Sequence, residues 1–309
     1  MQIVHGPTHG PVNARGAVIA IGNFDGVHRG HRALLAQAVT RAKEMERASG
    51  VMVFEPHPRE FFHPAEPLFH LTPLNRKLAI FEQLGLKLAF VENFDAHFAS
   101  LSAEEFIERV LVAGLGVAHV IIGYDFYFGH KRAGNPQMLV DAGAKLGFGV
   151  TVVAPVAEAG EVFSSSAVRV YLAQGDVKGA TQVLGEPWRV MGNIVGGARR
   201  GTGLGFPTAN VPMPKGTALA HGIYAVRAHV DGEVHNAAAY LGTRPTFDNG
   251  MPVLEVFLID FKGDLYGHHI DVEFIDFIRE DRKFDTAEAL VTQMDEDVKK
   301  IRDVLAGPA

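Results

Sequence analysis

Two histidines near the N-terminus, His28 and His31, are spaced in an H-x-G-H pattern just after a turn. Imidazole N–H groups can donate hydrogen bonds to phosphate oxygens, and the turn adds backbone N–H groups at Gly22, Asn23 and Phe24. A long helical pattern begins at the second histidine, so all five residues lie at the positive end of the expected helix. This spacing predicts a polyphosphate site, with a surface or capping role for each histidine as the simpler alternative.

Further polar groups follow other strand-like runs of the first half. They are His57 in the sequence FEPHP, Asp125 in GYDFYFG, and Ser164, Ser165 and Arg169 in SSSAVR. An arginine grips phosphate through charge-assisted hydrogen bonds, the serines offer hydroxyls at a helix start, and an aspartate can bind a ribose. The simpler alternatives are a rigid turn for EPHP and helix capping for the serines.

The second half contains a glycine-rich, basic segment, GGARRGTGLGFPTAN, at residues 196–210. Prolines rule out the helix that a dinucleotide fingerprint requires, so we expect a loop that closes on phosphate, with Gly205 in it. Thr208 and Asn210 are two residues apart and share one face if the chain is extended. Their oxygen atoms suit Mg²⁺, and an ordinary polar turn is the alternative.

Glu255 is a single carboxylate in a strongly apolar, strand-like run. By alternation Leu254, Val256 and Leu258 share one face, and Glu255 lies on the opposite face with Phe257. A lone acid in such a strand is costly unless it is exposed or functional, so Glu255 is a candidate catalytic base. A charge on an edge strand is the alternative.

These groups require a frame, and the first half alternates between strand-like and helix-like patterns. Strands are expected at residues 17–21, 51–54, 86–91, 119–122 and 150–154, and helices at 31–48, 73–84, 103–112 and 137–146. This alternation predicts a parallel sheet covered by helices, which is an α/β, Rossmann-like, doubly wound domain.

The second half has a different pattern. After two short helices at residues 164–184, short β-like runs at 222–230, 234–240, 254–259 and 270–277 predict a small antiparallel barrel or sandwich. A helix with one apolar stripe at residues 286–305 should pack on it. The predicted boundary near residue 185 divides the chain into domains at 1–185 and 186–309.

Composition limits the partners and the location. A formal net charge of −6 argues against nucleic-acid binding, and no apolar run approaches the 18 or so residues of a membrane span. The absence of cysteine and of a signal-peptide pattern favours a cytoplasmic protein. The oligomeric state is left open, a homo-oligomer included.

The motifs together resemble the bifunctional riboflavin kinase/FAD synthetase family of bacteria. The first half matches it through GNFDGVHRGH, FEPHP, GYDFYFG and SSSAVR, and the second half through GFPTAN, HGIYAV, GTRPTF, LEVFLIDFKGDLYG and FIREDRKF. The resemblance implies a nucleotidyltransferase domain followed by a six-stranded riboflavin kinase barrel. It implies that riboflavin is phosphorylated to FMN, and that FMN is adenylylated to FAD with release of pyrophosphate, each step using ATP and Mg²⁺.

The resemblance also implies roles for single residues. His28, His31 and Arg169 would serve AMP transfer, in which the FMN phosphate attacks the α-phosphorus directly. Thr208 and Asn210 would hold Mg²⁺–ATP, and Glu255 would activate the riboflavin 5′-hydroxyl. Arg279, in FIREDRKF, would contribute to cofactor binding.

The chain departs from the family pattern at three places. Ser166 stands where threonine is usual, Phe257 where many members have histidine, and Tyr240-Leu241 where Asn-Ile is usual. The last two are expected to alter the flavin pocket without removing a catalytic group. Two alternatives remain at this point: an enzyme with only the kinase active and a regulatory first domain, and a non-catalytic flavin-sensing protein.

Overall fold

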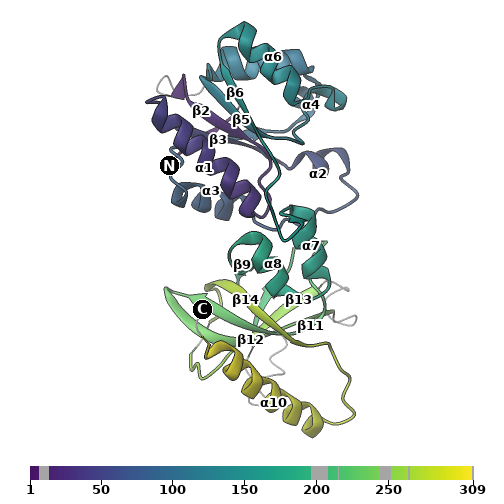
Figure 1. Cartoon of the computed structure of the whole chain (residues 1–309). Coiled ribbons are helices and arrows are strands. Elements are labelled where there is room, and N and C mark those ends of the chain that lie inside the picture. The colour runs from purple at the N-terminus through teal and green to yellow at the C-terminus, as the bar shows by residue number, and fades with distance from the viewer. Residues whose placement is uncertain (7–13, 196–207, 215, 244–251, 264, 308–309) are drawn as a thin grey trace. The chain divides into compact units, whose positions relative to one another are not determined.

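The computed structural model describes residues 1–6, 14–195, 208–214, 216–243, 252–263 and 265–307 (Figure 1). The chain forms two compact units, the first with residues 1–68 and 72–164 and the second with residues 69–71 and 165–309. Helices α7 (Ser165–Ala173) and α8 (Val177–Leu184) therefore belong to the second unit, although both precede the expected boundary near residue 185. The boundary between the catalytic domains stays a prediction.

A six-stranded parallel sheet is the frame of the first unit. In spatial order its strands are β1 (Gln2–His5), β4 (Leu88–Asn93), β3 (Ser49–Glu55), β2 (Val18–Ile21), β5 (His119–Gly123) and β6 (Gly149–Val153). Strand β2 pairs with β3 on one side and with β5 on the other, so the direction of winding reverses beside it. Ligands of open α/β sheets bind at the carboxyl ends of the strands next to such a reversal. The turn that follows β2 lies at this position.

Helices cover both faces of the sheet (Figure 1). One face packs against α1 (Arg29–Glu44) and α3 (Leu74–Gln83), and the other against α5 (Ala103–Glu105), the π-helix η2 (Phe106–Leu115) and α6 (Pro136–Leu146). Shorter elements complete the unit: α2 (Pro58–Phe62), α4 (Ala96–Ser100), η3 (His130–Arg132) and the hairpin β7 (Ala157–Glu158) and β8 (Glu161–Val162).

The central strand shows why its sequence lacks alternation. Val18 and Ala20 pack with the α1 side, Ile19 and Ile21 pack with the opposite side, and none of the four is more than 1% exposed. A strand buried on both faces is apolar at every position. The expected doubly wound α/β domain is confirmed.

The second unit is built on a six-stranded antiparallel sheet in the order β10-β13-β12-β11-β14-β9. Its strands are β9 (Arg189–Asn193), β10 (Ala209–Pro212), β11 (Gly222–Val230), β12 (Glu233–Thr243), β13 (Pro252–Leu258) and β14 (His269–Arg279). A β-bridge between Val195 and Asn210 links the two ends of this order, so the sheet is nearly closed into a barrel. The barrel expected from the short β-like runs is confirmed.

The C-terminal helix α10 (Ala287–Leu305) packs on the outside of the barrel. Thr286 caps it, since its side-chain oxygen accepts a hydrogen bond from the Ala289 N–H at 3.1 Å. Ile301 and Leu305 are buried in one cluster with barrel residues such as Ala225. The C-terminal part of the expected stripe, from Val298 to Leu305, packs on the barrel, whereas Ala287 at its start is exposed.

Several short elements of the first unit were not predicted, namely α2, α4, η3, β7 and β8, and two further elements differ from the expectation. Strand β1 was not predicted, because it is a four-residue edge strand whose side chains are largely exposed and therefore carries no apolar pattern. The helix expected at residues 103–112 begins as α5 and continues as η2 to Leu115, where Gly116 ends it in a left-handed conformation. Among the described residues, no helix combines the length and the apolar character needed to cross a bilayer.

Candidate active sites

The turn after β2 is held in an unusual backbone conformation. Phe24 and Val27 have φ angles of 49° and 42°, a left-handed region that costs a residue other than glycine about 1–3 kcal/mol. The carboxylate of Asp25 accepts a hydrogen bond from the Thr72 N–H at 3.2 Å and is 3% exposed. Strain of this kind persists where the surrounding structure imposes it, and it is typical of binding sites.

His28 is the N-cap of α1, as its Nδ1 accepts a hydrogen bond from the His31 N–H at 3.3 Å. An imidazole that accepts through Nδ1 carries its proton on Nε2, which can then donate to a ligand. Burial lowers the pKa of His28 to about 4, against a smaller opposing effect of Asp25. His28 is therefore neutral at physiological pH and can both cap the helix and donate to a phosphate.

His31 stacks on His28, with ring centroids 3.6 Å apart, and its ring meets the edge of Phe24 at 5.2 Å. Burial lowers the pKa of His31 well below its usual value, and His28 and Lys77 lower it further. Its Nδ1 and the Oδ1 of Asn23 are buried with no hydrogen-bond partner among the described residues. The turn therefore presents neutral donors and unused polar atoms, as a site for a polar ligand would.

Glycines allow this close packing. A Cβ at Gly30 would lie 3.1 Å from the His28 ring and 3.3 Å from the Phe163 carbonyl oxygen, and a Cβ at Gly22 would lie 3.2 Å from the Phe24 ring. Gly30 thus leaves room for the imidazole ring of His28, which a larger residue would crowd. The structure brings Gly22, Phe24, His28 and His31 together.

His57 and Asp125 lie at the carboxyl ends of β3 and β5, the two neighbours of β2. His57 caps α2, where its Nδ1 accepts a hydrogen bond from the Arg59 N–H at 3.1 Å, and the preceding Glu55–Pro56 bond is cis. Asp125 is exposed in the loop after β5, which also carries the half-exposed Tyr124 and Tyr127. Both stand at the ligand-binding edge of the sheet, and their contact with a ligand stays a prediction.

The serine motif follows β8. Ser164 ends the first unit and Ser165 begins α7, so the run does open a helix. Within the second unit, the Arg169 guanidinium donates two hydrogen bonds to the Phe69 carbonyl oxygen, at 2.9 and 3.2 Å. Arg169 is thus engaged with backbone in this structure, and its contact with phosphate stays a prediction.

A second set of predicted residues meets on the outer face of the barrel. Asn210 on β10 is the cross-strand partner of Glu255 on β13, and the Thr208 hydroxyl donates to Glu255 Oε2 at 3.3 Å. Leu254 and Val256 point to the opposite face and are fully buried. The alternation inferred from sequence is confirmed, and Thr208, Asn210 and Glu255 form one cluster of oxygen-bearing side chains.

The residues that depart from the family pattern flank this cluster. Tyr240 on β12 is the other cross-strand partner of Glu255, and its hydroxyl donates to Asp281 at 3.1 Å. Phe257 packs with the apolar residues under α10. Both line the same outer face of the sheet as Glu255.

Arg279 is held by α10. Its Nε and Nη2 donate to the Asp297 carboxylate at 2.7–3.1 Å, and its Nη1 donates to the Glu280 carbonyl oxygen at 2.9 Å. The side chains of Arg279 and Asp297 are only 12% and 8% exposed. This geometry makes Arg279 a link between barrel and helix, and its predicted contact with a cofactor remains a prediction.

Lys77 and Glu92 are two of several buried ionisable residues that the sequence patterns did not mark. Lys77 on α3 is 2% exposed and donates to the Asn23 carbonyl oxygen, and Glu92 on β4 is 1% exposed. A lysine within an amphipathic helix and a glutamate at a strand end resemble ordinary surface residues, so no local signal marks them. Gly205, predicted to bind phosphate, lies outside the described residues.

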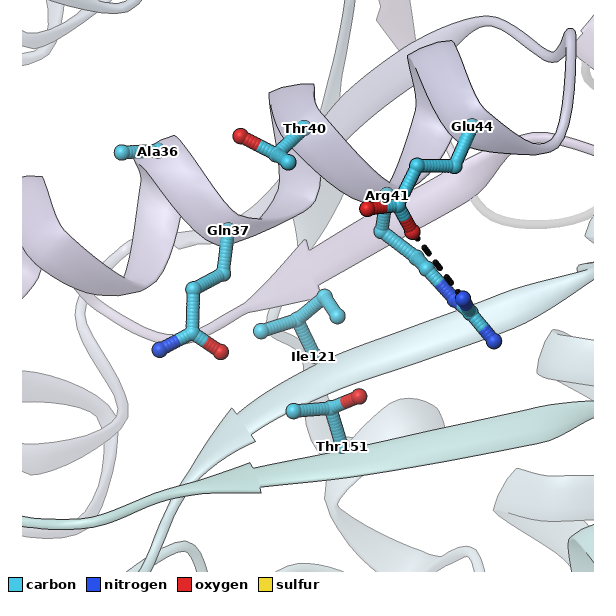
Figure 2. Close-up of a pocket in the computed structure, with 7 residues that line it drawn as sticks. All are labelled: Ala36, Gln37, Thr40, Arg41, Glu44, Ile121 and Thr151. Atoms are coloured by element: carbon cyan, nitrogen blue, oxygen red, sulfur yellow. Dashed lines mark hydrogen bonds and ion pairs between the residues drawn. The ribbon is translucent and has the colours of Figure 1, made fainter.

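A hollow of about 340 Å³ lies elsewhere, between the second half of α1 and strands β5 and β6 (Figure 2). Gln37, Thr40, Ile121 and Thr151 line it, together with Ala36 and the ion pair of Arg41 and Glu44, whose atoms are 3.0 Å apart. None of the predicted site residues lines this hollow, so we do not assign either reaction to it.

Comparison with known proteins finds a family model for each half of the chain. A family model described as FAD synthetase matches residues 11–167, and one described as riboflavin kinase matches residues 184–305. Proteins named bifunctional riboflavin kinase/FMN adenylyltransferase align over nearly the whole chain. The one from Pseudomonas fluorescens is 41% identical, covering 100% of this chain and 99% of its own length, and the one from Escherichia coli K12 is 39% identical, covering 93% and 92%.

A solved structure also aligns over the full length. A crystal structure from Streptococcus pneumoniae, titled a macrolide-efflux protein, superposes with a TM-score of 0.86 and 28% sequence identity, covering 98% of this chain and 99% of that one. The whole chain therefore has relatives with the same succession of two domains.

Proposed function

Because the chain belongs to the bifunctional riboflavin kinase/FMN adenylyltransferase family, we propose that each of its two sites carries one of the family's two reactions on the residues described above. The protein phosphorylates riboflavin to FMN and adenylylates FMN to FAD, with ATP as co-substrate of both steps. The assignment of single residues is our proposal. It rests on one observation above all: each matched family domain contains one cluster of polar side chains, the turn after β2 within residues 11–167 and the Thr208, Asn210 and Glu255 cluster within residues 184–305.

The turn after β2 would bind the ATP phosphates for adenylyl transfer. An FMN phosphate oxygen attacks the α-phosphorus and pyrophosphate leaves, so the nucleophile is already an anion and needs no base. His28 Nε2–H and the N–H groups at the start of α1 would donate to phosphate oxygens that gain charge in the transition state. Neutral imidazoles suit this role because their lowered pKa values keep them as hydrogen-bond donors of constant charge near neutral pH.

The cluster on the barrel would carry the kinase reaction. The riboflavin 5′-hydroxyl oxygen attacks the γ-phosphorus, ADP leaves, and Glu255 accepts the hydroxyl proton. The Thr208 hydroxyl, which donates to Glu255, would orient the carboxylate. A neutral alcohol needs such a base, and this need explains why a carboxylate stands in an otherwise apolar strand.

Mg²⁺ is proposed for both steps. On the barrel, Thr208 and Asn210 offer oxygen donors on one face beside a carboxylate, a donor set that fits this ion. When bound, Mg²⁺ would neutralise charge on the ATP phosphates. The cytoplasmic location predicted from composition stays a prediction, and no oligomeric state is assigned.

The alternative with an active kinase and a merely regulatory first domain is not favoured, because models of both catalytic domains match. The flavin-sensing alternative is not favoured for the same reason. A time course separates all three. The purified chain is incubated with riboflavin, Mg²⁺ and ATP, and FMN and FAD are separated chromatographically.

We expect FMN to appear first and FAD after it, with pyrophosphate released in step with FAD. FMN that accumulates without FAD would support the kinase-only alternative, and flavin that binds without turnover would support the sensor. FMN supplied directly, without riboflavin, tests the second step alone.

A further inference from the structure

Lys77 is a buried cation at the turn after β2. It lies on α3, is 2% exposed, and its Nζ donates a hydrogen bond to the Asn23 carbonyl oxygen at 3.3 Å. Burying an ammonium group without compensation costs several kcal/mol, so an ordinary core position would hold an apolar residue instead. Helix α3 offers apolar side chains on the same face, such as Ile80 and Phe81.

The surroundings of Lys77 contain both signs of charge. Burial lowers its pKa, while the carboxylates of Asp25, Glu55 and Glu60 oppose that effect and favour the charged form. The positive charge of Lys77 also lowers the pKa of His31. The ammonium group is therefore close enough to His31 to act on it electrostatically.

Other cations of this region are already engaged. The Arg29 guanidinium pairs with Glu158 and lies 4.4 Å from the centre of the Phe163 ring. The Arg32 Nε donates to the Val27 carbonyl oxygen at 3.1 Å.

His28 and His31 are neutral for the reasons given above, yet an ATP triphosphate carries several negative charges. Among the described residues at this turn, Lys77 is a buried cation, and it contacts the backbone that is proposed to bind phosphate.

We propose that Lys77 is the charge-supplying residue of the adenylyl-transfer site. Its ammonium group fixes the turn through the hydrogen bond to the Asn23 carbonyl oxygen. Its positive charge compensates the negative charge of the ATP phosphates through space, while the neutral histidines provide hydrogen bonds. The inference rests on the proposed function in that it places the ATP of adenylyl transfer at this turn. Lys77 is a positioning residue in this account, since its ammonium group contacts the Asn23 carbonyl oxygen of the turn and not the ATP itself.

The test compares Lys77→Met with Lys77→Arg. Methionine keeps most of the length and removes the charge, and arginine keeps the charge. For Lys77→Met we expect kcat/KM for ATP in adenylyl transfer to fall about 10- to 100-fold. Lys77→Arg should retain more of the activity. The kinase reaction of the same preparations should be unchanged, and Lys87→Met, which removes an exposed lysine of the same unit, is the matched control.

A purely structural role would give a different pattern. Methionine would leave the Asp25 carboxylate and the Asn23 carbonyl oxygen without the ammonium group, which destabilises a fold, and arginine is larger than the buried site, so both variants would be impaired alike. Lys77→Met with normal kcat/KM, or Lys77→Arg as impaired as Lys77→Met, would overturn the proposal.

Calorimetric titration with ATP and with AMP keeps the test valid if stability changes. Loss of charge should weaken ATP binding several-fold more than AMP binding, whereas a damaged site would weaken both alike and overturn the proposal. If Lys77→Met binds ATP more weakly than the wild type but the wild type forms no FAD, the result would instead contradict the proposed function.

Discussion

The turn after β2 and the outer face of the barrel are both proposed to bind ATP phosphates, but they use different chemical groups. The turn combines a strained backbone, a helix N-terminus and two buried neutral imidazoles. The barrel face combines a hydroxyl, an amide and a carboxylate on adjacent antiparallel strands.

The difference follows from the nucleophiles. The FMN phosphate is already an anion, so its site needs donors and positive charge. The riboflavin hydroxyl is neutral, so its site needs an acceptor for a proton. The chemistry of the attacking group, more than the shared co-substrate, decides which side chains each site uses.

The strongest test of this comparison removes the base. Glu255→Gln should lower kcat for FMN formation about 10³-fold, because the amide cannot accept the hydroxyl proton. Adenylylation of added FMN should be unaffected. Glu233→Gln, which changes an exposed carboxylate of β12, is the control. Loss of both reactions in Glu255→Gln would contradict the assignment of separate sites.

The corresponding change at the turn is His28→Ala. We expect FAD formation to fall about 10²–10³-fold while FMN still accumulates from riboflavin, because one donor to the transition state is lost. The variant also removes the N-cap of α1, at a cost of about 1 kcal/mol. His28→Asn can restore the cap without the imidazole, so an asparagine variant with full adenylyl transfer would refute the phosphate role.

The turn after β2 should respond to acid through His28. The folded-state pKa of His28, about 4, lies below its ordinary value of 6.5, so the unfolded chain takes up a proton first as pH falls. Stability is fully present above pH 6.5, and its loss between pH 6.5 and 4 should approach about 3 kcal/mol.

Chemical denaturation of wild type and His28→Asn across this range measures that effect as the difference between their slopes against pH. Equal slopes would show that His28 is not held neutral by the fold.

The smallest expected effect is on stability and involves Glu92. Like Glu255 it is a carboxylate on a strand, but no catalytic role is proposed for it. Its Oε1 is buried without a partner in the described part of the chain, and burial raises its pKa to about 7, above the ordinary 4.5. The folded state therefore favours the protonated form, and stability is lost as pH rises from 4.5 to 7.

Glu92→Gln should accordingly raise the free energy of unfolding by about 2 kcal/mol at pH 8 and by little at pH 4.5. Thermal or urea unfolding at the two pH values measures this. A variant that is less stable at pH 8 would indicate that the ionised carboxylate has a stabilising partner.

Local patterns account for most of what could be predicted. The 2-residue alternation around Glu255 set its face correctly, and the H-x-G-H spacing placed His28 and His31 at a helix start, since both depend on neighbours in sequence. The fold followed from the change between alternating patterns and short β-like runs.

Long-range contacts explain what was missed. Lys77 is 54 residues from Asn23, and Asp297 is 18 residues from Arg279, so neither partner is visible in a local pattern. The pKa of His28 likewise depends on burial by distant segments. Arg169 and Arg279 were expected at ligands, and the structure shows their guanidinium groups engaged with a carbonyl oxygen and a carboxylate.

Residues 69–71 bear on how this protein can be divided. They belong to the second unit, where the Trp188 indole N–H donates to the Leu71 carbonyl oxygen at 3.0 Å and the Phe69 ring meets the Trp188 ring at 5.6 Å. A fragment that starts at residue 165 or 186 would therefore lack part of its own fold, leaving a buried indole donor without its acceptor. A riboflavin kinase fragment would therefore need residues 69–71 as well as the C-terminal segment, because the second unit is not continuous in sequence.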